Sequence, residues 1–166
     1  MAFLILLALV LVTRFPFGGE SFHLFDASWA SFFLWGIWAE KTQSLIKGFV
    51  ALVIATVVVD GVVLGATAMS SYCFTPAYAG LLFTYFSLTL IGRLFCTQPL
   101  DYSNVKGLSK GLTPIVLAAF IASLVAFSIS NWFFYGFSGY FETMAASEYW
   151  SRVFTKYWPS YAVILV

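Results

Sequence analysis

The sequence predicts an all-α integral membrane protein, a bundle of six transmembrane helices in one domain. Of its 166 residues, 61% are hydrophobic, 20% are aromatic and only 9% are charged, whereas a soluble domain carries about 25% charged residues. The Lys, Arg, Asp and Glu residues lie near the edges of apolar runs, and Asp60 is the exception. Apolar runs of this kind need a hydrocarbon solvent, so the lipid bilayer is the first expected partner.

The first three helices are predicted from apolar runs and their end signals. The first, residues 1–13, is short and is followed by Arg14 and turn-forming residues. No basic leader or small-residue cleavage site indicates a signal peptide. The second begins at Asp26 or Ser28, because both residue types favour the N-cap position. The third begins at Gly48 and is rich in β-branched residues, a composition that a helix tolerates in lipid.

Two of the last three helices begin at a proline, which is favoured in the first turn of a helix. The fourth opens at Thr75-Pro76 and the fifth at Thr113-Pro114. The sixth begins between Ser147 and Pro159 and continues to the last residue. The expected helices cover residues 1–13, 27–40, 48–66, 76–92, 112–129 and 147–166 of a single membrane domain, residues 1–166.

The basic residues predict the orientation of the bundle. Five of them lie in loops on one side: Lys41 and Lys47 in loop 40–47, and Arg93, Lys106 and Lys110 in loop 93–111. The loops on the other side, 14–26, 67–75 and 129–146, hold only Arg14. Cytoplasmic loops carry the excess of Lys and Arg, so the lysine-rich side and both termini are expected in the cytoplasm.

Composition and motifs exclude several function classes. A net charge of +1 offers no basic face for nucleic acid. The sequence has no Walker loop, HExxH, GxSxG or paired carboxylates on one helix. The motifs that carry out ATP hydrolysis, proteolysis and ester hydrolysis are therefore missing. Cys73 and Cys96 lie in different loops or helix ends and form neither a disulfide framework nor a CxxC motif.

The predicted topology gathers unusual residues on the outer side. These are His23, Cys73 and an aromatic loop, residues 131–140, that contains Asn131 and Tyr135. The aromatic loop is equally typical of a belt at the membrane interface, but its two glycines and its asparagine favour a shaped loop. His23 is either a loop residue packed at the interface or a hydrogen-bond donor or metal ligand. We therefore expect an outward-facing site.

Asp60 and Cys73 carry the sharpest chemical signals. Asp60 is the only acid well inside a predicted span, where a charge costs roughly 3 kcal/mol, so it should face the interior and have a partner. That partner is either a neighbouring helix or a ligand. Cys73 precedes a helix start, where the dipole favours a thiolate that could ligate a soft or borderline metal. A lone cysteine is also typical of a small buried apolar residue.

Three segments resemble BtuM, a family of small cobalamin transporters of Gram-negative bacteria. The family is similar to the substrate-binding S-components of energy-coupling factor (ECF) transporters. The matching segments are His23–Leu34 (HLFDASWASFFL), Ser71–Ala79 (SYCFTPAYA) and Ser130–Phe141. The resemblance extends over nearly the whole chain.

The resemblance implies a six-helix S-component fold in the bacterial inner membrane, with cobalamin in a pocket that faces the periplasm. Cys73 matches the position of the family's cobalt-ligating cysteine, and Asp60 and Tyr78 match pocket positions. His23 and the 131–140 loop fit the mouth of the same pocket. The expected cobalamin-binding residues are Cys73, Asp60, Tyr78, His23, Asn131 and Tyr135.

The implied function is cobalamin uptake, powered by the protein's own motion or by an unidentified ATPase or ECF-type module. A Cys73 thiolate on cobalt could also help to expel the opposite axial ligand, which would be an enzymatic decyanation of cyanocobalamin. Two alternatives remain open. One is an S-component-like binder of another vitamin, and the other is a structural membrane protein whose outer aromatic residues anchor it without a corrinoid.

Overall fold

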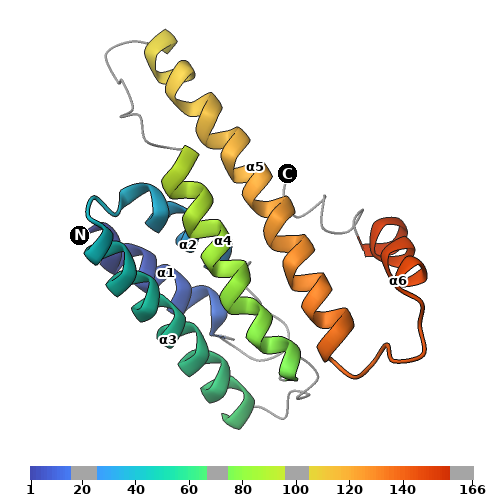
Figure 1. Cartoon of the computed structure of the whole chain (residues 1–166). Coiled ribbons are helices and arrows are strands. Elements are labelled where there is room, and N and C mark those ends of the chain that lie inside the picture. The colour runs from blue at the N-terminus through green and yellow to red at the C-terminus, as the bar shows by residue number, and fades with distance from the viewer. Residues whose placement is uncertain (16–25, 67–74, 96–104, 158–166) are drawn as a thin grey trace.

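The computed structural model describes residues 1–15, 26–66, 75–95 and 105–157, and all regular structure in these ranges is helical (Figure 1). Three of the helices are long and apolar enough to cross a membrane. These candidate spans are Thr42–Val63, Pro76–Phe95 and Gly111–Phe137. The prediction of an all-helical chain with apolar helices of membrane-spanning length is confirmed.

The long helices run alternately up and down (Figure 1). In chain order the elements are α1 (Ala2–Arg14), α2 (Ser28–Trp38), α3 (Thr42–Ala66), the 3₁₀ turn η2 (Pro76–Ala79), α4 (Gly80–Phe95), α5 (Val105–Phe137), α6 (Ala146–Arg152) and the π-helical turn η3 (Val153–Tyr157). Helices α1, α3 and α5 end toward the same side of the molecule, and η2 begins there. We call this side the Arg14 end.

Helices α2 and α4 approach each other closely through glycine. A Cβ atom at Gly36 would lie 2.2 Å from the Thr89 carbonyl oxygen, and one at Gly92 would lie 2.4 Å from the Phe33 carbonyl oxygen. Across the same contact, the Thr89 hydroxyl donates to the Phe32 carbonyl oxygen at 3.1 Å. Small residues that let two backbones approach are typical of helix pairs in membranes.

The core lies between α1, α2 and α4, with α3 and α5 contributing one face each. Its most buried side chains include Leu6, Val10, Phe32, Leu52, Tyr85, Leu88, Ala118, Ala122 and Ala126. The opposite faces of α3 and α5 expose large apolar side chains, among them Ile54, Val58, Val116 and Phe120. Helices that are apolar all round suit a hydrocarbon environment.

Helix α5 is much longer than expected. Predicted for residues 112–129, it begins at Val105 and ends at Phe137, with Pro114 inside the helix. Proline removes one backbone hydrogen bond, a loss that helices in membranes tolerate. At the other end the helix continues through the aromatic residues and stops before Gly139, whose φ of +78° is a conformation that glycine adopts readily. The expected outer loop 129–146 is therefore wrong in its first half, because residues up to Phe137 are helical.

The bounds of the other helices differ less from the predicted ones. Helix α3 begins at Thr42 where Gly48 was expected, and α4 ends at Phe95 instead of residue 92. Hydropathy reports where the hydrocarbon begins and not where the helix ends, so helices continue past their apolar runs into the predicted loops 40–47 and 93–111. Of the last predicted helix, 147–166, the structure describes the part up to Tyr157, as α6 and η3.

We expect Gly92→Ala to destabilise the α2–α4 contact, because the new Cβ would meet the Phe33 carbonyl oxygen. Overpacking of this kind costs about 1–3 kcal/mol, which should lower the melting temperature in detergent. Gly61→Ala is the matched control, since Gly61 is exposed on α3 and a Cβ there meets no atom within 4 Å. Equal melting temperatures of the two variants would contradict the close approach.

Candidate functional site

An ionic cluster surrounds the guanidinium group of Arg14, the last residue of α1. The Arg14 Nε and Nη2 atoms donate to the two carboxylate oxygens of Asp60 at 2.8 and 2.7 Å. Its Nη1 atom donates to Asp26 Oδ2 at 3.0 Å, and to the hydroxyls of Ser28 and Tyr85 at 2.9 Å each. One arginine thus joins α1 to α2, α3 and α4. We call this group, together with Tyr78, the Arg14 cluster.

Asp60 has the interior partner that its position in the sequence predicts. It lies on α3 inside the candidate span Thr42–Val63, and its side chain is 18% exposed, against 14% for Arg14. Arginine matches a carboxylate with two parallel hydrogen bonds, the strongest geometry for such a pair. A third donor, the hydroxyl of Tyr78, also reaches Asp60 Oδ2. The structure therefore brings together Asp60 and Tyr78, two of the predicted site residues.

Local hydrogen bonds hold the start of α2 against the end of α1. Asp26 Oδ1 accepts from the Ser28 backbone N–H at 2.9 Å and from the Ser28 hydroxyl at 2.6 Å, a turn that Asp favours before a helix. The Thr13 hydroxyl oxygen accepts from the Ala27 N–H at 3.1 Å. Helix α2 begins at Ser28, one of the two predicted starts, and Asp26 stabilises the turn that precedes it.

Two tyrosines complete the cluster from the α4 side. Pro76 opens the η2 turn as predicted, and the Tyr78 N–H donates to the Thr75 carbonyl oxygen at 2.8 Å. This turn directs Tyr78 toward α3. Tyr85 stacks on Phe32 of α2, with ring centroids 4.1 Å apart and an interplanar angle of 5°. The stack holds the Tyr85 hydroxyl at the guanidinium group.

Asn131 and Tyr135, the other described site residues, link α5 to α6. The Asn131 amide donates to the Phe127 carbonyl oxygen at 2.9 Å, and its oxygen accepts from the Tyr149 hydroxyl at 3.1 Å. The Tyr135 hydroxyl donates to the Met144 carbonyl oxygen at 2.8 Å. Both residues therefore fasten α6 and the loop before it to α5. Their hydrogen bonds do not connect them to the Arg14 cluster.

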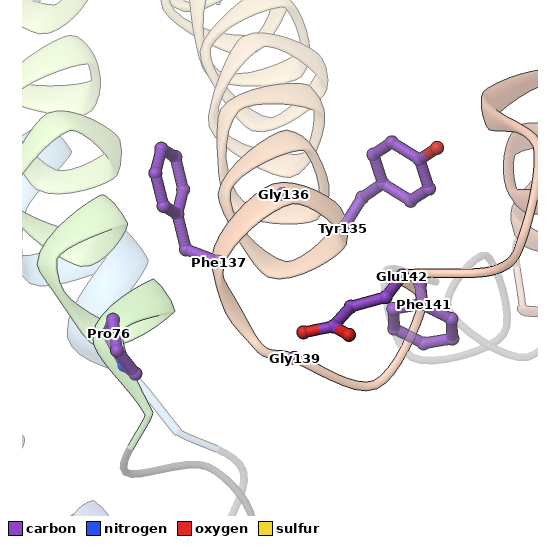
Figure 2. Close-up of a pocket in the computed structure, with 7 residues that line it drawn as sticks. All are labelled: Pro76, Tyr135, Gly136, Phe137, Gly139, Phe141 and Glu142. Carbon is purple, nitrogen blue, oxygen red and sulfur yellow. The ribbon is translucent and has the colours of Figure 1, made fainter.

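A pocket of about 430 Å³ opens between η2 and the C-terminal end of α5 (Figure 2). It is lined by Pro76, Tyr135, Gly136, Phe137, Gly139, Phe141 and Glu142. Pro76 precedes Tyr78 by two residues, so the pocket and the Arg14 cluster share the η2 turn. Tyr135 thus lines this pocket while its hydroxyl is bonded to Met144.

The predicted residues His23 and Cys73 lie outside the described residues, as does Cys96. Within ranges 1–15, 26–66, 75–95 and 105–157, no group of three or more His, Cys, Asp or Glu side chains could hold a metal ion. Comparison of the sequence with models of protein families and with curated proteins finds no match. The candidate site is therefore interpreted from its own residues.

Sequence reasoning missed Arg14 as the partner of Asp60. The signal was present, because Arg14 is the only basic residue in the predicted outer loops and Asp60 the only acid well inside a predicted span. Two such charges are natural partners. No comparable signal marks Tyr85, whose role depends on its stack against Phe32.

Arg14→Met is expected to destabilise the fold by about 3–5 kcal/mol, because it leaves the Asp60 carboxylate buried without its guanidinium partner. Adding Asp60→Leu to the same chain should restore much of this loss, since an apolar pair avoids the desolvation cost of both charges. Denaturant titration in detergent micelles measures both effects.

The control for this prediction is Arg152→Met. Arg152 pairs with Glu148 at 2.7 Å, but the two side chains are 58% and 53% exposed, and pairs of this kind contribute less than about 1 kcal/mol. If Arg14→Met is no more harmful than Arg152→Met, the Arg14 cluster does not stabilise the fold.

Proposed function

We propose that this chain is a cobalamin-binding membrane transporter of the BtuM type. In this proposal it is a six-helix protein of the bacterial inner membrane, similar to ECF S-components. The observation that carries the proposal is the hydrogen bond between Tyr78 and Asp60. The two residues lie on separate elements and match the pocket positions that the resemblance implies, so their direct contact supports a common site.

The position of Cys73 in the chain supports its role as the cobalt ligand. It precedes Thr75 by two residues, and two residues of fully extended chain span at most about 7.2 Å. Thr75 leads directly into the turn that carries Tyr78. Because a corrin ring supplies the equatorial nitrogen ligands of cobalt, one protein thiolate is enough to fill an axial position.

The Arg14 cluster offers this ligand a preformed polar surface. Asp26 is the most accessible acid of the cluster, with a side chain that is 46% exposed, whereas Arg14 is largely covered. Carboxylate and phenol groups accept hydrogen bonds from the amides of a corrinoid. The ion pair holds Asp60 in place before the ligand arrives, which lowers the cost of ordering the site on binding.

The same thiolate could release cyanide from cyanocobalamin by ligand substitution. The thiolate displaces the nitrogen of the nucleotide base from one face of the ring and forms a cobalt–sulfur bond there. Cyanide then leaves the opposite face with its electron pair, and water takes its place. The cobalt keeps its oxidation state, so the step needs no reductant. Free cyanide released on mixing the protein with cyanocobalamin is the readout.

We expect Cys73→Ser to abolish cobalt ligation and leave the helices folded, because Cys73 would be an added ligand and not a part of the packed core. The measurement is the visible spectrum of the bound corrinoid, with Cys96→Ser as the matched control. Identical spectra of the wild type and Cys73→Ser would exclude Cys73 as a ligand.

A simple observation separates this proposal from its alternatives. Protein purified from cells supplied with cobalamin should be coloured by bound corrinoid. A structural membrane anchor would be colourless, and an S-component-like binder of another vitamin would lack the absorption spectrum of a corrinoid. A colourless preparation that also fails to bind added cobalamin would overturn the proposed function.

The proposed orientation puts Cys73 toward the periplasm and Cys96 toward the cytoplasm. A small, membrane-impermeant thiol reagent applied to intact spheroplasts should then label Cys73 and spare Cys96. Added cobalamin should protect Cys73 from the reagent, which would connect the exposed thiol to the ligand. Labelling of Cys96 with no labelling of Cys73 would mean that the orientation is inverted.

A further inference from the structure

The pocket at the end of α5 has walls that are about as polar as apolar, with open space between them. Pro76 lies on the η2 side, and Phe137 and Phe141 come from the end of α5 and the loop that follows (Figure 2). A Cβ atom at Gly136 or at Gly139 would meet no other atom within 4 Å. The positive φ of Gly139 turns the chain so that Phe141 and the next residue also line the pocket.

The lining carries one charge. Glu142 is exposed, and Figure 2 shows its carboxylate lying beside Gly139, toward the pocket. No Lys or Arg is among the described lining residues. An ionised carboxylate only accepts hydrogen bonds, and it repels anions. The complementary ligand group is therefore a hydrogen-bond donor without negative charge, attached to an apolar stem that can lie against Phe137 and Pro76.

We propose that this pocket binds an amide-bearing arm at the rim of the corrinoid, with the Glu142 carboxylate accepting a hydrogen bond from the amide N–H. The inference rests on the proposed function and names the part of the ligand that enters this pocket. Rim arms are short methylene stems that end in primary amides, and this fits both the walls and the charge.

The alternative part of the ligand, its nucleotide, fits less well. It carries a phosphodiester, whose negative charge the Glu142 carboxylate would repel. A pocket of about 430 Å³ is also too small for the whole corrinoid, so only a peripheral group can enter. Pro76 of the pocket and Tyr78 of the Arg14 cluster share the η2 turn, so a ring larger than this pocket has the Arg14 cluster as a neighbouring polar surface.

The first test changes the charge of the ligand arm and the charge of residue 142. Mild hydrolysis converts single rim amides of cobalamin to carboxylates, and at least one of these monocarboxylates should bind the wild type about tenfold more weakly than cobalamin, the scale of a hydrogen bond to a charged group. Glu142→Gln keeps the size and removes the charge, so it should bind that monocarboxylate and cobalamin equally. Glu148→Gln, which changes an exposed acid outside the pocket, should behave as the wild type.

The second test fills the pocket. Gly136→Leu extends into the open space beside α5, so it should lower cobalamin affinity at least about tenfold and leave the melting temperature unchanged. The control is Gly61→Leu, which adds the same group at an exposed site on α3. Cobinamide, a corrinoid without the nucleotide, should show the same loss on Gly136→Leu, because the rim and not the nucleotide occupies the pocket.

The outcomes separate this inference from the proposed function. If the wild type binds no corrinoid, the proposed function fails. A different result overturns only the pocket assignment. In that result the wild type binds cobalamin with the Cys73-dependent spectrum, Glu142→Gln restores the affinity for no monocarboxylate, and Gly136→Leu binds cobalamin as the wild type does. If Gly136→Leu lowers the affinity for cobalamin but not for cobinamide, the pocket holds the nucleotide and the rim assignment is wrong.

Discussion

The structure at the Arg14 end depends on one constraint, that the charge of Asp60 must be paired. Asp60 lies within a membrane-length apolar span, where an isolated carboxylate is costly. Arg14 meets this requirement and, with its remaining hydrogen bonds, contacts α2 and α4 as well. One arginine, with its ion pairs and hydrogen bonds, therefore fixes how four elements lie relative to one another. Any site at this end is built on that arrangement.

Packing deeper in the molecule makes the same arrangement possible. The glycine contacts bring the α2 and α4 backbones together, and that short separation lets Phe32 and Tyr85 stack. The stack in turn delivers a hydroxyl to Arg14. The glycine contacts, the aromatic pair and the ionic group thus follow one another in space, from the core to the proposed ligand site, and each positions the next. The α5–α6 contact, made through Asn131 and Tyr135, is a separate hydrogen-bonded unit.

Hydropathy predicted the helical class and the apolar spans but not the helix ends, and the reason is physical. A helix continues past its apolar run wherever backbone hydrogen bonds can still form, as α5 does on both sides of Pro114 and up to Phe137. Asp60 could be predicted to have an interior partner because charge at that depth requires one. The role of Asn131 could not be predicted from the sequence, because its contact with Tyr149 depends on how the chain folds back after α5.

The shortness of α2 has a consequence for the surrounding bilayer. With 11 residues, α2 extends over roughly 16 Å, while the hydrocarbon layer is about 30 Å thick. Helix α3, with 25 residues, has no such deficit. Where α2 meets lipid, hydrophobic mismatch favours local thinning of the membrane and access of water to Arg14. A solute at the Arg14 end would then lie closer to the opposite face of the bilayer than the full hydrocarbon thickness implies.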